Sequence, residues 1–218
     1  FRSFKFRYII IYMRLLDVLK SEDNIRLDKK TLVVLRWIAI GGQFTTINFV
    51  YFVLNFNFPF IFCLSVIFLG AITNFFLQFR YKNKLLSGFN SSLYLTYDLT
   101  QLAILVFLTG GITNPFVILL VIPAVVSSTF LSLKSTLNLS FITGIFLLVL
   151  TIYHLPLPSL ELLHFHVPDY YLYGIPISII IGLIFLCYFG ARFGLENRKR
   201  TEALNKLELV LAKDPAAR

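Results

Sequence analysis

The chain of 218 residues is 57% hydrophobic and 14% charged, and its mean hydropathy is +0.79. This composition excludes an ordinary soluble globular domain and is typical of a membrane protein built from helices. The formal net charge is +9, but the basic residues gather in clusters between apolar blocks. That distribution argues against a nucleic-acid-binding surface, so no nucleic acid is expected as a partner.

Residues 1–31 form a basic segment that precedes the first apolar block and carries several aromatic residues. One interpretation places this lead-in on the cytoplasmic membrane surface, with its aromatic side chains among the headgroups and its cations on anionic lipid. The other interpretation is an unstructured leader. The sequence leaves both open.

Six apolar blocks follow, and each approaches the roughly 20 residues that a helix needs to cross a bilayer. They lie at about 32–54, 59–79, 93–109, 115–133, 136–153 and 170–191. The second and fourth connections carry Lys or Arg, as do both ends of the chain, whereas the other connections carry none. By the positive-inside rule, we expect an all-α integral membrane fold of six transmembrane helices with both termini cytoplasmic.

Two ionisable residues fall inside predicted spans, Arg36 in the first and Asp98 in the third. Both lie about five residues from the predicted cytoplasmic boundary, at a depth of roughly 7–8 Å. Equal depth favours an ion pair, which would offset the cost of burying either charge alone. The alternative is that Arg36 extends its long side chain to the headgroups.

Four amides are also predicted within the spans, at Gln43, Asn48, Asn74 and Gln101. Such residues usually form hydrogen bonds to neighbouring helices, and Gln101 shares the helix face of Asp98. The pair Gly41 and Gly42 is expected to allow a close approach between helices. Pro123 is expected to kink the fourth span.

The third connection is the heptapeptide GGITNPF at residues 110–116. Gly110 and Gly111 suit the left-handed conformation that ends a helix. Asn114 is a favoured N-cap, and Pro115 at the next position loses only an N–H without a helical partner. As a binding site, the helix N-terminus and the Asn114 amide would offer donors to ligand carbonyls, with Phe116 as a flat apolar wall. Spacing alone favours a plain hairpin over a binding site.

The fifth connection, at about 154–169, holds the chain's three histidines, including the pair His164-x-His166. Because no third ligand stands at a suitable spacing, we predict no metal site there. Cys63 and Cys187 lie within predicted spans, where they are expected to be small apolar residues.

From 195 to 213 the chain becomes polar, with a narrow stripe of leucines near helical spacing at Leu195, Leu204, Leu207 and Leu211. This pattern predicts a helix that continues the sixth span into the cytoplasm. A stripe of this kind favours a parallel homodimer through the sixth span and the 195–213 helix.

Several of these segments resemble the sensor region of RegB/PrrB-type redox-sensing histidine kinases, in the same order along the chain. They are residues 35–40 (LRWIAI), 97–102 (YDLTQL), 108–116 (LTGGITNPF), 154–158 (HLPLP) and 207–212 (LELVLA). The resemblance runs from about Thr31 to Ala212. It is most specific at the heptapeptide, because the family carries GGxxNPF between its third and fourth spans.

The resemblance implies a sensor of the bacterial inner membrane, in which ubiquinone or a related quinone binds near the heptapeptide and tunes a kinase. Carried over by position, the quinone-binding residues are Gly110, Gly111, Asn114, Pro115 and Phe116. The intramembrane polar residues expected to couple the site to the output are Arg36, Gln43, Asp98 and Gln101.

The sequence departs from the family after the 195–213 helix, where the family continues into a phosphoacceptor helix and an ATP-binding domain. As it stands, the chain is expected to have no kinase activity, and a response regulator would be a partner only through that further region. Two other classes remain as alternatives. They are a small six-span transporter or channel, and a membrane enzyme with a histidine-rich external site.

Overall fold

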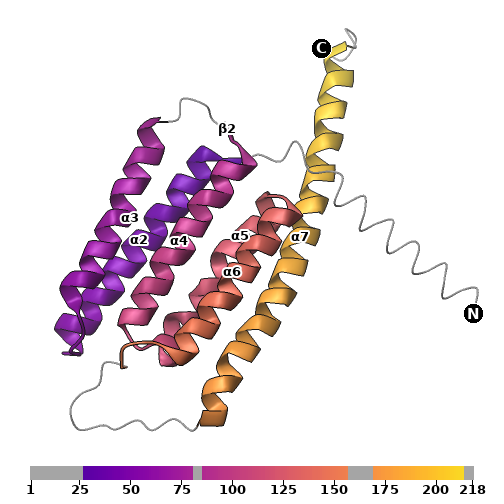
Figure 1. Cartoon of the computed structure of the whole chain (residues 1–218). Coiled ribbons are helices and arrows are strands. Elements are labelled where there is room, and N and C mark those ends of the chain that lie inside the picture. The colour runs from indigo at the N-terminus through magenta and orange to yellow at the C-terminus, as the bar shows by residue number, and fades with distance from the viewer. Residues whose placement is uncertain (1–26, 81–84, 157–168, 214–218) are drawn as a thin grey trace, which may run out of the picture.

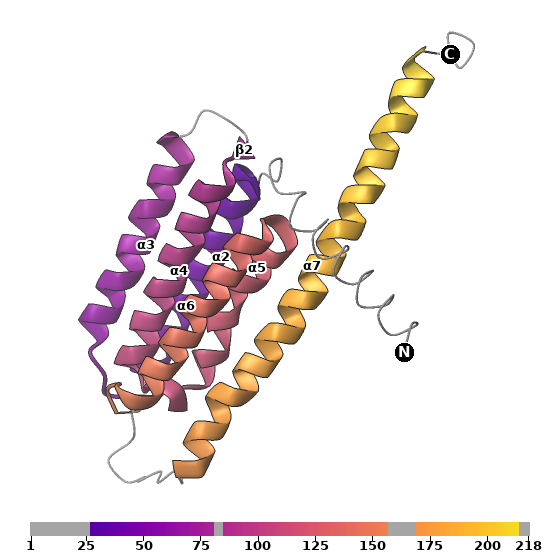
Figure 2. The same cartoon turned by 45° about the vertical axis from the view of Figure 1, so that its right-hand side comes forward.

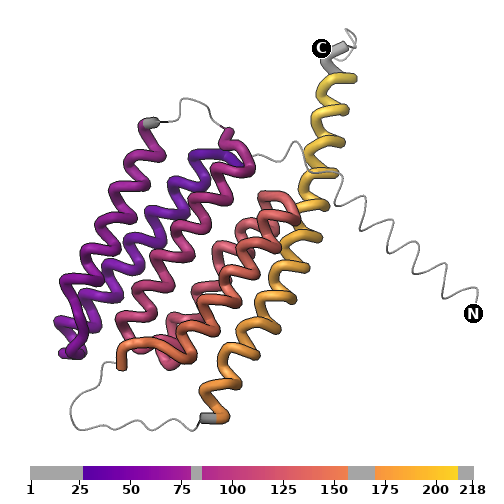
Figure 3. The backbone as a smooth tube through the Cα atoms, in the orientation of Figure 1, coloured from indigo at the N-terminus to yellow at the C-terminus, as the bar shows by residue number. Residues whose placement is uncertain are grey.

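The computed structural model describes residues 27–80, 85–156 and 169–213. Most of the basic lead-in, together with His164 and His166, lies outside these ranges. The described chain passes back and forth along one bundle of helices (Figure 1). Its first residues and the end of its last helix lie at the same end of the bundle, and the heptapeptide lies at the opposite end (Figure 3).

The helices follow the six predicted blocks in order. They are α2 (Lys29–Asn48), which continues as a π-helix (Phe49–Val53), α3 (Phe60–Arg80), α4 (Gly88–Leu108), α5 (Ile122–Phe130), α6 (Leu133–Ile152) and α7 (Asp169–Lys213). Two 3-10 helices, Gly111–Thr113 and Pro115–Val121, join α4 to α5. The all-α fold class is therefore confirmed.

Five of the helical segments in the described chain are long and apolar enough to cross a membrane. The predicted fourth span is shorter than expected, because its helical stretch runs from Pro115 to Phe130 rather than to residue 133. Its first seven residues form a 3-10 helix, and Pro123 stands in the first turn of the α-helix that follows. Six full membrane crossings thus remain a prediction.

The helices bury small and branched side chains between them and turn large apolar side chains outward. Leu99, Leu120, Leu139 and Leu147 are fully buried in the main core, whereas Phe62, Phe79 and Phe141 are more than two-thirds exposed. A soluble bundle would not expose so many large apolar groups. Lipid would cover them without cost in the bilayer.

One feature at the end of the bundle that holds the chain's first described residues was not predicted. Residues Leu27–Asp28 pair antiparallel with Leu85–Leu86 as a minimal two-stranded sheet. Leu27 and Leu86 are both almost completely buried there. This short sheet joins the start of α2 to the start of α4, and it fixes the relative register of the two helices that carry Arg36 and Asp98.

The predicted role of Gly41 and Gly42 is wrong. Among the described residues, a Cβ atom at either position would meet no heavy atom within 4 Å, so neither glycine lies at a close contact between these helices. The close approaches occur at other glycines. Gly70 of α3 packs on the Gln101 side chain, and Gly194 of α7 packs on the backbone of Thr129 at the end of α5.

Helix α7 is a single helix of 45 residues, about 67 Å long. It packs along α5 and then extends beyond the rest of the bundle (Figure 2). The predicted continuity between the sixth span and the 195–213 helix is therefore confirmed. Leu204 and Leu207 on the extension are 61% and 56% exposed, which leaves the leucine stripe available to another surface.

Candidate functional site

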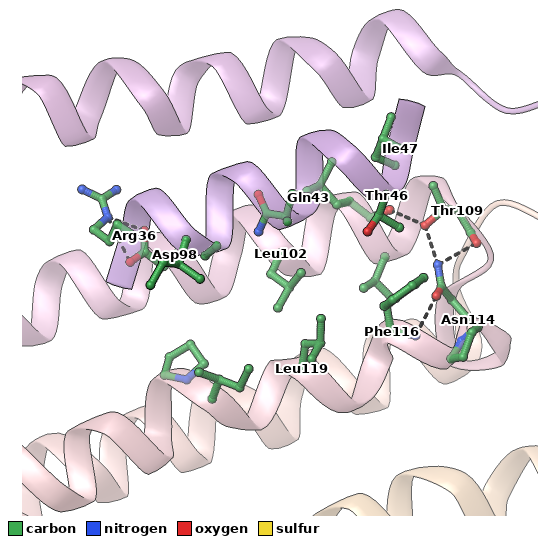
Figure 4. Close-up of a pocket in the computed structure, with 18 of the residues that line it drawn as sticks. Arg36, Gln43, Thr46, Ile47, Asp98, Leu102, Thr109, Asn114, Phe116 and Leu119 are labelled. Carbon is green, nitrogen blue, oxygen red and sulfur yellow. Dashed lines mark hydrogen bonds and ion pairs between the residues drawn. The ribbon is translucent and has the colours of Figure 1, made fainter. Parts of the chain in front are cut away.

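A cavity of about 690 Å³ lies between α2 and α4 on one side and the Pro115–Val121 helix with the start of α5 on the other (Figure 4). Its walls are almost entirely apolar, with Leu102 of α4 and Leu119 of the 3-10 helix among the side chains that line its middle. Polar groups gather toward its two ends. Arg36 and Asp98 line one end, and Thr109 and Asn114 line the other.

The predicted pair between Arg36 and Asp98 is confirmed. Arg36 Nε donates to Asp98 Oδ1 at 2.8 Å and to Oδ2 at 3.1 Å. Arg36 Nη2 donates to the hydroxyl of Thr73 on α3 at 2.8 Å, so the guanidinium group links three helices. The Arg36 side chain is 3% exposed and that of Asp98 is 25% exposed. Arg36 therefore does not extend to the headgroups, and Asp98 is the more accessible member of the pair.

Aromatic rings complete the surroundings of the Arg36 guanidinium. Its Cζ atom lies 5.2 Å from the ring centroid of Tyr94 and 5.6 Å from that of Tyr97, both within cation–π range. Arg36 Nη1 is buried and has no hydrogen-bond partner among the described residues. The two tyrosine rings partly compensate for that missing bond.

Gln43 lies between the two ends of the cavity, on α2. Its Oε1 atom accepts a hydrogen bond of 2.9 Å from Gln101 Nε2 on α4. Asn74 Nδ2 donates to the carbonyl of Val33 on α2, so it also bonds to a neighbouring helix as predicted. Asn48 differs, because it bonds to Phe44 of its own helix.

The backbone of the heptapeptide has the predicted conformation. Gly110 and Gly111 have φ angles of 116° and 56°, the region that side chains disfavour. Asn114 is extended and caps the helix that begins at Pro115, and its Oδ1 accepts from the N–H of Phe116 at 2.8 Å. The N-cap and the left-handed glycines are thus confirmed.

The amide donors of Asn114 are used inside the loop. Asn114 Nδ2 donates to the carbonyl of Thr109 at 3.0 Å and to its hydroxyl at 2.6 Å, and the Asn114 side chain is buried. The Asn114 amide is therefore already bonded to Thr109, and its role toward a ligand stays a prediction. The reason is local: Thr109 ends α4 and presents two acceptors directly opposite the cap.

Three of the five predicted heptapeptide residues line the cavity, namely Asn114, Pro115 and Phe116. Phe116 is 43% exposed and its ring forms part of the wall (Figure 4). Gly110 and Gly111 do not line the cavity. They are buried, and a Cβ atom at Gly111 would collide with the side chain of His154, so these glycines shape the turn instead.

Two residues that follow α6, His154 and Leu155, contact the heptapeptide and the end of α4. His154 covers Gly111, and the N–H of Leu155 donates to the carbonyl of Phe107 near the end of α4 at 3.0 Å. This contact was not predicted from the sequence. A histidine just after a predicted span, at the same membrane surface as the loop, was the available signal.

Three threonines of the site were also not predicted from the sequence: Thr46 and Thr109 line the cavity, and Thr73 binds Arg36. Threonine is common in transmembrane helices, where it usually bonds to its own backbone, so its presence alone carried no signal. In the part of the chain that the structure describes, no group of three metal-ligating side chains is present. The arrangement suits a long, mostly apolar ligand with a small polar group.

Comparison with known proteins identifies related sequences but no related structure. The chain is 34% identical over 187 residues to the sensor histidine kinase RegB of Cereibacter sphaeroides, which covers 85% of this chain and 40% of that protein. A second RegB, from a named strain of the same species, is 35% identical over 193 residues, 88% of this chain and 41% of its own length. The chain thus spans about two fifths of the length of these curated relatives. No family model and no solved structure matches.

Proposed function

We propose that this chain, a RegB-type sensor domain of a multi-pass inner-membrane protein, binds a membrane quinone. The proposed site is the cavity between α2, α4 and α5. The oxidation state of the quinone pool would then set the output of a histidine kinase. The observation that carries this proposal is the cavity itself, because its wall includes Phe116 of the GGITNPF heptapeptide.

The chemistry of the cavity supports a quinone as its ligand. A quinone is a planar ring with two polar substituents and a long isoprenoid tail. The cavity offers apolar walls for the tail and the ring, and a few polar groups placed at its ends. Ligand sites of this kind usually combine a mostly apolar lining with a small number of fixed polar groups.

A route from the cavity to α7 runs through the short fourth segment. Phe116 and Leu119 lie on the Pro115–Val121 helix, which continues without a break into α5. Helix α5 packs against α7, with close approaches where Gly190 meets the side chain of Ser128 and Gly194 meets the backbone of Thr129. A quinone affects the output only by binding one arrangement of these helices more tightly than another. We take the α5–α7 contact as the element that carries this difference.

The output half of the proposal rests on α7. The exposed stripe with Leu204 and Leu207 would pair with the same stripe of a second copy, as a parallel homodimer. Kinase activity and a response regulator as partner belong to the longer proteins of this type. With positive-inside charge placement, the end of the bundle that holds the end of α7 is cytoplasmic and the heptapeptide is external.

Quinone binding can be measured on the chain itself through its one tryptophan. Trp37 lies on α2 next to Arg36 and Ile38, which both line the cavity, while its own ring packs on Phe75 of α3. A quinone bound there quenches Trp37 fluorescence, so titration of the chain in lipid nanodiscs with a short-tailed benzoquinone gives its affinity. We expect saturable quenching in the wild-type chain.

Phe116→Ala tests the position of the site. We expect it to weaken quinone binding by roughly tenfold, because loss of a partly buried aromatic wall removes one or two kcal/mol of contact. The matched control is Phe130→Ala on α5, since Phe130 is 41% exposed and does not line the cavity. Equal affinities for the two variants and the wild type would contradict this location.

A further inference from the structure

We propose that the Pro115–Val121 helix is a conformational switch, which Pro123 holds in the 3-10 form and whose conversion to an α-helix would draw α5 along α7. This inference goes beyond the proposed function, because it concerns a movement of the protein itself and does not depend on a ligand in the cavity. It assigns to Pro123 the control of the backbone hydrogen bonds of this segment.

The Pro115–Val121 helix is unusually long for its type. It contains seven residues, whereas 3-10 helices longer than three or four residues are uncommon because their hydrogen bonds have poorer geometry than those of an α-helix. The residues from Phe116 to Val121 are all apolar, and none of them is glycine or proline. Their side chains do not exclude an α-helix, so the cause of the 3-10 form lies outside the segment.

The residue that excludes the α form is Pro123, in the first turn of α5. The N–H of Ile122 donates to the carbonyl of Leu119, three residues earlier. In an α-helix that carbonyl would accept from the N–H of residue 123 instead. Proline has no N–H, and its ring collides with the carbonyl of the residue four positions before it. The 3-10 bond therefore gives the Leu119 carbonyl a partner that the α form does not provide.

An α-helical form would keep the same side chains buried. The buried residues of the stretch recur at spacings of three and four, which is the pattern of an α-helix with one buried face. Apart from Pro123, they are Val117, Leu120, Val121, Ala124, Ser127 and Ser128. One continuous α-helix through this stretch is thus compatible with the core of the bundle.

Conversion would change the length of the segment. Its seven residues span about 14 Å at the rise of a 3-10 helix and about 10.5 Å at the rise of an α-helix. The segment would therefore shorten by roughly 3.5 Å, and one of its two ends would have to move.

The heptapeptide end of the segment is held by other parts of the bundle. Asn114 donates two hydrogen bonds to Thr109, at the end of α4. The side chain of His154, which follows α6, covers Gly111. Because both contacts fix the turn that precedes Pro115, α5 is the end that would move.

The contact between α5 and α7 permits such a movement. Gly190 and Gly194 of α7 lie against Ser128 and Thr129 of α5. The hydroxyl groups of these two α5 residues both donate to the carbonyl of Val125 in their own helix. Among the residues that the structure describes, no side-chain hydrogen bond joins α5 to α7. Helix α5 would therefore shift along α7 without breaking one.

Two side-chain hydrogen bonds to α6 oppose the movement. The hydroxyl groups of Ser127 and Thr136 lie 3.1 Å apart, and Thr143 donates to the carbonyl of Leu120 at 3.5 Å. Both threonines also donate to a backbone carbonyl of α6 or its N-cap, so they keep a partner when these bonds break. The position of α5 thus depends chiefly on the length of the segment, and so on Pro123.

The experiment measures the position of α5 in the whole chain in lipid nanodiscs, by pulsed electron paramagnetic resonance. In a parent with Cys63→Ala and Cys187→Ala, nitroxide labels are attached through Phe130→Cys, at the end of α5, and Tyr153→Cys, just after α6. Both positions are exposed. A reference pair joins Tyr153→Cys to Phe89→Cys, at the start of α4, and does not include α5.

Pro123→Ala supplies the missing N–H of residue 123. We expect it to shorten the distance between the labels at 130 and 153 by about 3 Å and to leave the reference distance unchanged. Pro123→Val repeats the test with a side chain closer in volume to the buried proline. Pro176→Ala is the matched control, because it restores an N–H inside α7 instead. It is expected to leave both distances unchanged.

Three results would overturn the inference. One is an unchanged distance between 130 and 153 in the folded Pro123 variants. Another is the same shortening in Pro176→Ala, which would make the effect unspecific. The third is loss of folding in both Pro123→Ala and Pro123→Val, because the proposal requires the α form to be a folded state. Circular dichroism and thermal unfolding report whether each variant has folded.

A measurement on the wild-type chain needs no variant. Backbone chemical shifts from solid-state NMR report the ψ angles of residues 115–121, which we expect at about −20° to −30°. Values of about −42° throughout the segment are those of an α-helix and would also overturn the inference. No quinone is present in any of these experiments, so their failure would leave the proposed quinone site to its own test.

Discussion

At the Arg36 end of the cavity, polar side chains from three helices form hydrogen bonds to one another. At the heptapeptide end, the polar groups form hydrogen bonds within a single loop. Arg36 reaches Asp98 and Thr73, which are 62 and 37 residues away in sequence. Asn114 reaches Phe116 and Thr109, which are two and five residues away. The same cavity thus has one end built by tertiary packing and one end built by local backbone geometry.

This difference bears on how each end would respond to a ligand. The loop keeps its hydrogen bonds as long as its own turn persists, so it acts as a rigid wall. The Arg36–Asp98–Thr73 contacts exist only while α2, α3 and α4 keep their present positions. A ligand that shifts these helices would therefore be detected first at the Arg36 end.

The largest expected effect is at the end built by packing. Asp98→Ala leaves the Arg36 guanidinium buried without its counter-ion, and this should destabilise the chain by about 3–5 kcal/mol. Unfolding in detergent, followed by circular dichroism, would measure the loss. The double variant Arg36→Met with Asp98→Leu should recover most of it, because it removes both charges. If the double variant does not regain stability, the Arg36–Asp98 pair stabilises the chain by more than the mutual neutralisation of its charges.

A smaller effect is expected at the loop end. Gly111→Ala forces a side chain into a φ of 56° and against His154, which should cost about 2 kcal/mol. Gly144→Ala on α6 is the matched control, since its Cβ would meet no heavy atom within 4 Å and alanine favours a helix. The difference between their unfolding midpoints measures the strain. Equal midpoints would contradict the described turn.

The smallest effect is expected between the two ends. Gln101→Leu removes the hydrogen bond to Gln43, and such bonds between transmembrane helices average about 0.6 kcal/mol. The new side chain must also fit against Gly70, where the Gln101 carboxamide now packs. If this variant is as unstable as Asp98→Ala, the two ends of the cavity are energetically coupled rather than independent.

Much of the candidate site could be predicted from sequence, for reasons that differ by residue. The cap at Asn114 and the left-handed glycines depend on neighbours in the chain, so their geometry follows from local chemistry. The Arg36–Asp98 pair is a long-range contact. It was predictable because membrane depth supplies one coordinate for each charged residue, and burial in lipid leaves few alternatives to pairing.

Other parts could not be predicted, because they depend on how the helices turn toward one another. Helix rotation decided that Gly70 rather than Gly41 lies at a close contact. The same rotation brought Thr73 to Arg36 and placed His154 on Gly111. The commitment of the Asn114 amide to Thr109 was local, yet it required the loop conformation to be known.

The sequence by itself determined an all-helical membrane protein, the position of its turns and the two intramembrane charges that pair. These follow from the length of apolar runs, from backbone preferences and from the cost of an unpaired charge in lipid. Only the tertiary structure decided that the pair and the heptapeptide border one cavity, with Asp98 as the more accessible member of the pair. A cavity is the space that packed helices leave unfilled, and no single segment encodes it.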